Sequence, residues 1–222
     1  MTNSETLAAL LRSRASCRGF LPDAVSPDII DDVLRDAQHV PSWCNSQPWR
    51  VEACGAEETA RLAAALYAHV GQAGHASDVA FPKAYENEYQ ERRRECGWQL
   101  YAAVGVEKGD RVGSAQQMRE NFRLFGARHF LLITTPKALG PYGVLDCGAF
   151  VTAVLLGLEA RGLGGIAMAS VAGFSPFMRE WFDVDEERDV LCGIALGHPD
   201  TDHPANKFRT TRAPKDEVVR WR

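Results

Sequence analysis

The sequence predicts a single domain in which a β-sheet is layered with helices, of the α/β or α+β class. Two observations lead to this prediction. Segments with strand character alternate with segments of helical periodicity, which is not typical of a sandwich. The chain has 222 residues, 45% of them hydrophobic, enough for a real core, and it shows no internal repeat or linker-like stretch. We therefore expect residues 1–222 to form one domain.

The first third of the chain is expected to hold two helices, a strand and a third helix. Ser4 can cap a short amphipathic helix, and Ser26 with Pro27 begins a stronger one whose apolar face extends to Val40. Pro41 cannot continue that helix. The β-branched and aromatic residues of 49–54 then predict a strand, and the pattern of 56–70 predicts a helix.

Residues 71–118 have the weakest pattern, because glycines and alanines are followed by the polar run YENEYQERRRE. We expect a helical excursion over the surface here. The run RHFLLITT at 128–135 predicts a buried strand that Pro136 closes, and a helix follows over 144–161. Gly162 is expected to cap that helix. The last predicted elements are a short strand at 166–169, a helix near 176–182 and a strand at 189–196.

Charge and hydropathy exclude several classes of function. The 25 Lys and Arg residues against 29 Asp and Glu leave a net charge of −4, which argues against a nucleic-acid binder. The longest uncharged apolar stretch, 147–158, is shorter than the ~18 residues that span a membrane. The N-terminal segment lacks the features of a secretory signal, so we expect a cytoplasmic protein. The 6 cysteines and 6 histidines lack metal-ligand spacing, so no metal site is predicted.

One candidate binding segment is the run Arg14-Ala15-Ser16-Cys17-Arg18. If the chain is extended here, alternate residues project to the same side, so that two guanidinium groups and a hydroxyl converge. Such groups suit a phosphate or an anionic ring. Taken alone, the pattern is also typical of a solvated surface.

A second candidate is the loop PSWCNSQPW at 41–49, which places polar amides between two tryptophans. This composition suits a planar heteroaromatic ligand. The alternative is a helix-to-strand connection in which Asn45 and Gln47 satisfy backbone groups.

The glycines at 162–165 and the basic tail carry weaker signals. The run GLGGIA formally matches G-x-G-x-x-G/A, but a helix precedes it and a strand follows, the reverse of the dinucleotide-binding arrangement. Gly164 and Gly165 still leave room for a flat ligand beside bare backbone. The tail, which includes Lys207, Arg209 and Arg212, has the simpler interpretation of a solvated terminus. No nucleophile motif is present, and Cys44 lacks a base nearby in the sequence.

Together these segments resemble the FMN-dependent nitroreductase family, in particular its nitrobenzoate-reductase-like branch. The resemblance spans most of the chain but is poor over 71–118. The matching motifs, in the family's order, are R-x-S-x-R-x-F at Arg14, Ser16, Arg18 and Phe20, P-S-x-x-N-x-Q-P-W at Pro41 to Trp49, the GLG turn at Gly162 to Gly164, G-x-P at Gly197 and Pro199, and a late arginine, Arg212.

The resemblance implies an α+β fold, with a mixed, mainly antiparallel sheet flanked by helices, in an intertwined homodimer. Arg14, Ser16 and Arg212 would then hold the phosphate and ribityl chain of FMN, with Ala15 in contact through its backbone. Arg18 and Arg123 would lie near the N1 and O2 edge of the flavin ring. The loop from Pro41 would reach the other subunit's flavin through Ser42, Trp43 and Asn45, with Gln47 on the same loop. Backbone N–H groups of Gly164 or Gly165 would lie near flavin N5.

The implied activity is that of an oxidoreductase in which NADH or NADPH gives a hydride to FMN and a small-molecule acceptor, a nitroaromatic or a quinone, then takes two electrons. No catalytic side chain is expected, because the chemistry belongs to the flavin. Two alternatives stay open. One is a flavin-binding relative with another chemistry, such as flavin fragmentation, dehalogenation or azole formation, and the other is a non-enzymatic flavin-binding module.

Overall fold

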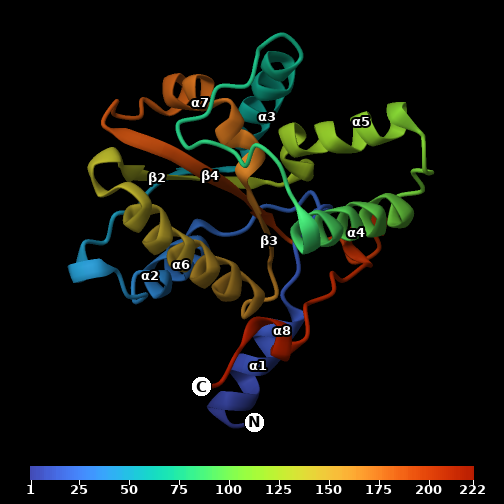
Figure 1. Cartoon of the computed structure of the whole chain (residues 1–222). Coiled ribbons are helices and arrows are strands. Elements are labelled where there is room, and N and C mark those ends of the chain that lie inside the picture. Colours follow the sequence, from blue (N-terminus) through green and yellow to red (C-terminus); the bar gives the residue numbers. More distant parts are fainter.

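The structure, a computed structural model that describes residues 1–222, is built on a four-stranded sheet with helices on both faces (Figure 1). The strand order is β1-β2-β4-β3, and every pairing between strands is antiparallel. A parallel bridge joins Ser16 to Gly165 at the β3 edge. The α+β class with a mixed, mainly antiparallel sheet is therefore confirmed. The strands are β1 (Arg50–Cys54), β2 (His129–Pro136), β3 (Gly164–Met168) and β4 (Arg188–Gly197).

The helices agree with the predicted order. Two of them, α4 and α5, lie in the segment expected to be a helical excursion, and Figure 1 shows both standing to one side of the sheet. The helices are α1 (Asn3–Ser13), α2 (Pro27–Ala37), α3 (Ala56–Val70), α4 (Asn87–Ala103), α5 (Arg111–Arg119), α6 (Gly140–Glu159), α7 (Ser175–Phe182) and α8 (Lys215–Val218).

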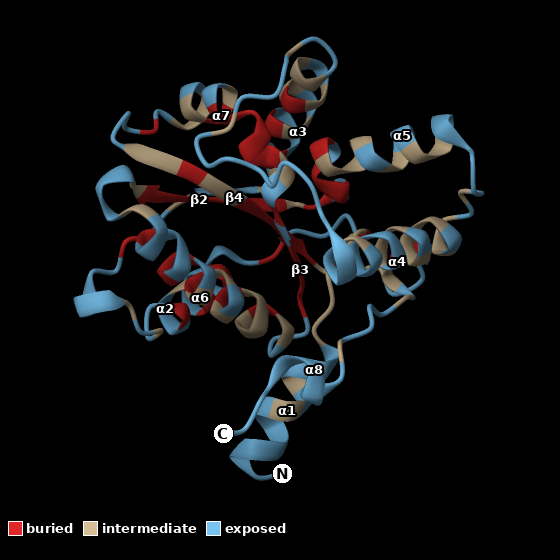
Figure 2. Ribbon diagram, viewed as in Figure 1, coloured by how far each residue is buried: buried red, intermediate tan, exposed pale blue.

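The sheet separates two apolar clusters because side chains alternate between its faces. Phe130 and Leu132 of β2 belong to the cluster that α3 and α7 cover, whereas Leu131 and Ile133 belong to the cluster under α2 and α6. All four side chains are at most 1% exposed. Figure 2 shows this buried centre along β2, β3 and β4.

The starts of three elements differ from the predictions by two residues or more. Thr2, not Ser4, caps α1, because Thr2 and Glu5 form a capping box. Helix α6 begins at Gly140 rather than 144, since Pro141 fits the first turn of a helix. Strand β3 begins at Gly164 rather than 166. The prediction for Gly162 is confirmed, because its φ is +69° and the N–H of Leu163 donates to Leu158 O at 2.9 Å.

Helix α6, together with the turn that precedes it, is long and apolar enough over 137–159 to cross a membrane, which the shorter stretch 147–158 did not indicate. In the structure it packs as a core helix, with Phe150, Val154 and Leu158 fully buried against the sheet. Its other face remains apolar and exposed, most clearly at Leu145, which is 67% exposed.

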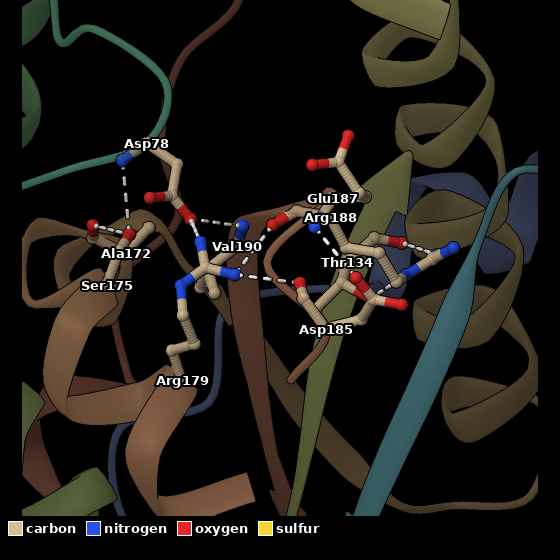
Figure 3. Close-up of polar contacts among 9 residues, drawn as sticks. All are labelled: Asp78, Thr134, Ala172, Ser175, Arg179, Asp185, Glu187, Arg188 and Val190. Carbon is tan, nitrogen blue, oxygen red and sulfur yellow. Dashed lines mark hydrogen bonds and ion pairs between the residues drawn. The ribbon is translucent and has the colours of Figure 1, made fainter. Parts of the chain in front are cut away.

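The loop before α4 is anchored to the sheet by Asp78 (Figure 3). Its carboxylate Oδ2 lies 2.5 Å from Nη2 of Arg179 and accepts the N–H of Val190 at 2.8 Å. Its own N–H donates to Ser175 Oγ at 3.2 Å, and that hydroxyl donates to Ala172 O at 2.8 Å. One carboxylate thus joins the loop to α7 and β4.

Asp78→Ala is expected to lower the free energy of unfolding by about 2–3 kcal/mol, because it leaves the largely buried guanidinium of Arg179 without its counter-ion. The loss stays below that of a fully buried pair because Arg179 keeps its bonds to two backbone carbonyls. Urea unfolding measures the effect. Glu91→Ala, which removes an exposed carboxylate of α4, is the control and should change stability by less than ~0.5 kcal/mol. Equal losses in the two variants would contradict the prediction.

Candidate functional site

The segment that follows α1 lies against the edge of β3. The N–H of Cys17 donates to Gly165 O at 3.2 Å, and the chain continues in extended form towards Phe20, which bridges Pro199. Gly164 permits this close approach, because a Cβ at Gly164 would lie 2.7 Å from Cys17 Sγ. The segment is therefore fixed on the sheet and its side chains have defined directions.

The C-terminal segment folds back onto the same residues. Asn206 is the link: its Oδ1 accepts the N–H of Arg18 at 2.6 Å and its Nδ2 donates to Gly19 O at 2.8 Å. This places Phe208 and Arg212 beside the end of α1, although almost two hundred residues separate them in the sequence.

Between these segments and α4 lies a cavity of about 360 Å3, which we call the arginine cleft. Its lining contains five arginines and no carboxylate, so that it forms a concentrated positive potential within a chain of negative net charge. Residues lining it are Leu11, Arg12, Arg14, Ala15, Ser16, Arg18, Cys96, Phe208, Arg209, Thr210 and Arg212. The five predicted residues Arg14, Ala15, Ser16, Arg18 and Arg212 are brought together here.

Arg14 and Arg18 have little compensation from the protein itself, whereas Arg209 and Arg212 donate to backbone carbonyls of the tail. Arg14 makes no side-chain hydrogen bond or ion pair. Arg18 is half-buried, donates only to Ser16 O at 3.4 Å, and lies 5.8 Å from the Phe208 ring centroid. Burial lowers the pKa of Arg18, because its charged form loses hydration. A bound anion would stabilise the guanidinium charge in place of the hydration lost on burial. The cleft therefore suits a phosphate.

A second cavity of about 450 Å3 adjoins the arginine cleft, and Ala15, Ser16 and Arg209 line both. Gly164 also lines it, whereas Gly165 is buried in β3 under α6. A Cβ at Gly165 would lie 2.7 Å from Leu158 Cδ1, so helix packing already accounts for that glycine.

Arg209 and Lys207 fall within the simpler interpretation of a solvated tail, but the structure places both at the cavities. Arg209 lines both cavities and Lys207 lines the second. No local pattern distinguishes them from other tail cations, since their place depends on the contacts of Asn206. Arg123, in contrast, lines neither cavity. It pairs with Glu120 at 3.5 Å and lies 4.5 Å from the Tyr67 ring centroid.

The loop that follows α2 lies apart from the arginine cleft, beyond α2 and α6 in Figure 1, and lines neither cavity. Cys44, Asn45 and Gln47 have φ values of 50°, 56° and 45°. Such left-handed conformations cost roughly 1–2 kcal/mol for each residue other than glycine. Pro41, Ser42 and Trp43 border an apolar groove of about 800 Å3 on the outer face of α6. Apart from Arg123 and the two glycines, the predicted site residues therefore form two separate groups in one chain.

Comparisons with known proteins agree with this architecture. Residues 11–198 match the family model described as the nitroreductase family. The chain is 31% identical to a 4-nitrobenzoate reductase of Nocardioides sp. (strain LMS-CY), over 97% of this chain and 89% of the relative. It is 29% identical to a 4-nitrobenzoate reductase of Pseudomonas putida, over 92% and 90% of the two chains. The crystal structure of the FMN-dependent nitroreductase NfnB from Mycobacterium smegmatis in complex with NADPH matches with a TM-score of 0.95 at 27% identity, covering 100% of both chains.

Proposed function

Because the chain belongs to the nitroreductase family, we propose that it is an FMN-dependent NAD(P)H oxidoreductase that reduces nitroaromatic or quinone-like acceptors by two electrons in a ping-pong cycle. The relatives named as 4-nitrobenzoate reductases support the acceptor class. The FMN-dependent structural neighbour with NADPH supports the cofactor and the donor. The protein would act as a homodimer in the cytoplasm, each subunit being one FMN-binding domain.

The single observation that carries the proposal is the arginine cleft, with five guanidinium groups and no carboxylate. A dianionic phosphate monoester fits this donor set, because arginine forks match phosphate oxygens. Arg14, Ser16 and Arg212 would hold the FMN phosphate and ribityl chain, with Ala15 in contact through its backbone. We add Arg209 to this group because it also lines the cleft.

When bound, FMN would accept a hydride from NADH or NADPH and pass two electrons to the acceptor. The part of Arg18 is electrostatic: a fixed guanidinium at the N1 and O2 edge of the ring would stabilise negative charge that develops there. The backbone of Gly164 or Gly165 would face N5. The place of Arg123 at the ring edge stays a prediction, because Arg123 lines neither cavity.

The homodimer is supported by the second group of site residues. Ser42, Trp43 and Asn45 lie away from the arginine cleft, so a flavin that they contact belongs to another subunit. The surface around them is apolar and accessible, with Trp43 55% exposed and Leu145 67% exposed. Exposed apolar surface of this kind marks an interface. The outer face of α6 and the loop from Pro41 to Gln47 would therefore meet the second subunit.

The test is a spectrum of the protein purified after incubation with FMN. We expect flavin absorbance that stays with the protein, bleaches anaerobically on addition of NADPH or NADH, and returns on addition of 4-nitrobenzoate or a quinone. Absence of retained flavin contradicts the proposal. Reduced flavin that ignores these acceptors but reacts productively with another substrate favours the alternative chemistry, and steady NAD(P)H oxidation with an added acceptor excludes a non-enzymatic module.

A further inference from the structure

A buried carboxylate on α6 contacts the strained loop. Asp146 is 8% exposed and is the one charged residue that lines the apolar groove. Its Oδ2 accepts the N–H of Trp43 at 3.0 Å, and the carboxylate makes no other hydrogen bond. Burying a carboxylate in apolar surroundings costs free energy unless the carboxylate is hydrogen-bonded. The hydrogen bond to Trp43 is therefore important for the placement of Asp146.

The contact replaces a missing cap. Trp43 begins the short 3-10 turn Trp43–Asn45, whose first N–H groups have no partner within the turn. The preceding residue, Ser42, does not cap the turn, because its Oγ accepts the N–H of Gln47 at 3.0 Å. Asp146 thus supplies the missing acceptor from a distant part of the chain, and a charge-assisted bond is stronger than a neutral one.

A second anchor comes from the same face of α6. The ring of Tyr142 meets Trp43 edge-on, with centroids 4.1 Å apart and planes at 76°. Tyr142 and Asp146 are four residues apart, and such residues lie side by side on a helix. Three residues of the loop that are not glycine have positive φ, a conformation that persists only where the surroundings fix it. The two α6 side chains provide that fixation at Trp43.

We propose that Asp146 is a positioning residue that holds Trp43, and through it the strained turn, in the conformation that presents Ser42 and Asn45 to the flavin of the second subunit. This inference rests on the proposed function. Asp146 lines neither the arginine cleft nor the adjoining cavity, so its proposed part is to position the loop and not to bind the flavin. Its influence passes through one backbone hydrogen bond, so an asparagine, whose side-chain carbonyl can also accept that bond, should substitute for it.

The experiment compares Asp146→Ala, Asp146→Asn and Glu186→Ala, each labelled with 5-fluorotryptophan and titrated with FMN. Glu186→Ala is the control, because it removes an exposed carboxylate that lines neither the groove nor the two cavities. The chain has 5 tryptophans, and Trp43→Phe identifies the resonance of Trp43. We expect Asp146→Ala to shift or broaden that resonance alone and to raise the Kd for FMN about tenfold or more, the change that follows from one lost charge-assisted hydrogen bond. Asp146→Asn should keep both properties within about threefold of the wild type, and Glu186→Ala should match the wild type.

Unchanged Trp43 resonance and FMN affinity in Asp146→Ala would overturn the inference. A moved resonance with unchanged affinity would also overturn it, because the loop would then be held without serving the flavin. If the wild type binds no FMN, the proposed function fails together with the flavin part of the inference, and the resonance alone decides the anchoring. The other four tryptophans report on folding, and Asp146→Ser replaces the alanine variant if they collapse.

Discussion

Arg14→Ala is expected to raise the Kd for FMN about 10- to 100-fold and to leave the free energy of unfolding nearly unchanged. The loss of affinity follows from one hydrogen bond between charged groups, worth about 1.5–3 kcal/mol. The stability is spared because Arg14 lies at the end of α1, where its side chain makes no ion pair or hydrogen bond with the rest of the chain. The substitution should therefore weaken FMN binding without destabilising the fold.

Fluorescence titration of FMN, repeated at low and high salt, measures the effect. Wild-type affinity should fall more steeply with salt than that of Arg14→Ala, because the variant has one charge fewer to screen. Arg35→Ala is the control: this exposed arginine of α2 pairs with Asp32, away from the cleft, and its loss should not change the Kd. An unchanged Kd in Arg14→Ala would refute its assignment to the phosphate.

The elements of the fold follow from local patterns. Helix α3 has the predicted bounds, and β1, β2 and β4 lie within one residue of theirs, because apolar runs between turn residues define them. The start of β3 was missed since glycine disfavours strands. In the structure, Cys17 lies so close to Gly164, and Leu158 so close to Gly165, that neither position has room for a side chain. Tertiary contact thus overrides local preference at the strand that borders the site.

The candidate site likewise contains residues that a local pattern predicts and residues that only tertiary contacts bring together. Arg14, Ser16 and Arg18 are recognisable because their spacing along one extended segment is itself a pattern. Arg209 and Asp146 have no such pattern: one depends on the fold-back at Asn206, the other on a contact across 103 residues of sequence. Groups that converge from distant segments become visible only in three dimensions.

Gly164→Ala is expected to weaken both folding and flavin binding, because Gly164 connects the sheet to the segment that carries the arginines. The new Cβ would lie 2.7 Å from Cys17 Sγ, 2.9 Å from Cys17 Cβ and 3.2 Å from Pro199 Cβ. The backbone of Cys17 must then move away from β3, which costs about 1–3 kcal/mol as in other overpacked sites. Ser16 and Arg18 move with it, so FMN affinity should fall at least about tenfold.

The apoprotein distinguishes two origins of that loss. If the Cys17 contact is responsible, Gly164→Ala lowers the unfolding free energy without any flavin, and Cys17→Gly in the same chain restores part of it. Gly97→Ala is the matched control: it adds a methyl to α4 where nothing lies within 4 Å, and should stabilise by about 0.5–1 kcal/mol. Should apoprotein stability stay unchanged while FMN affinity falls, the methyl group would instead oppose the flavin directly, and Gly164 would be a contact residue rather than a structural link.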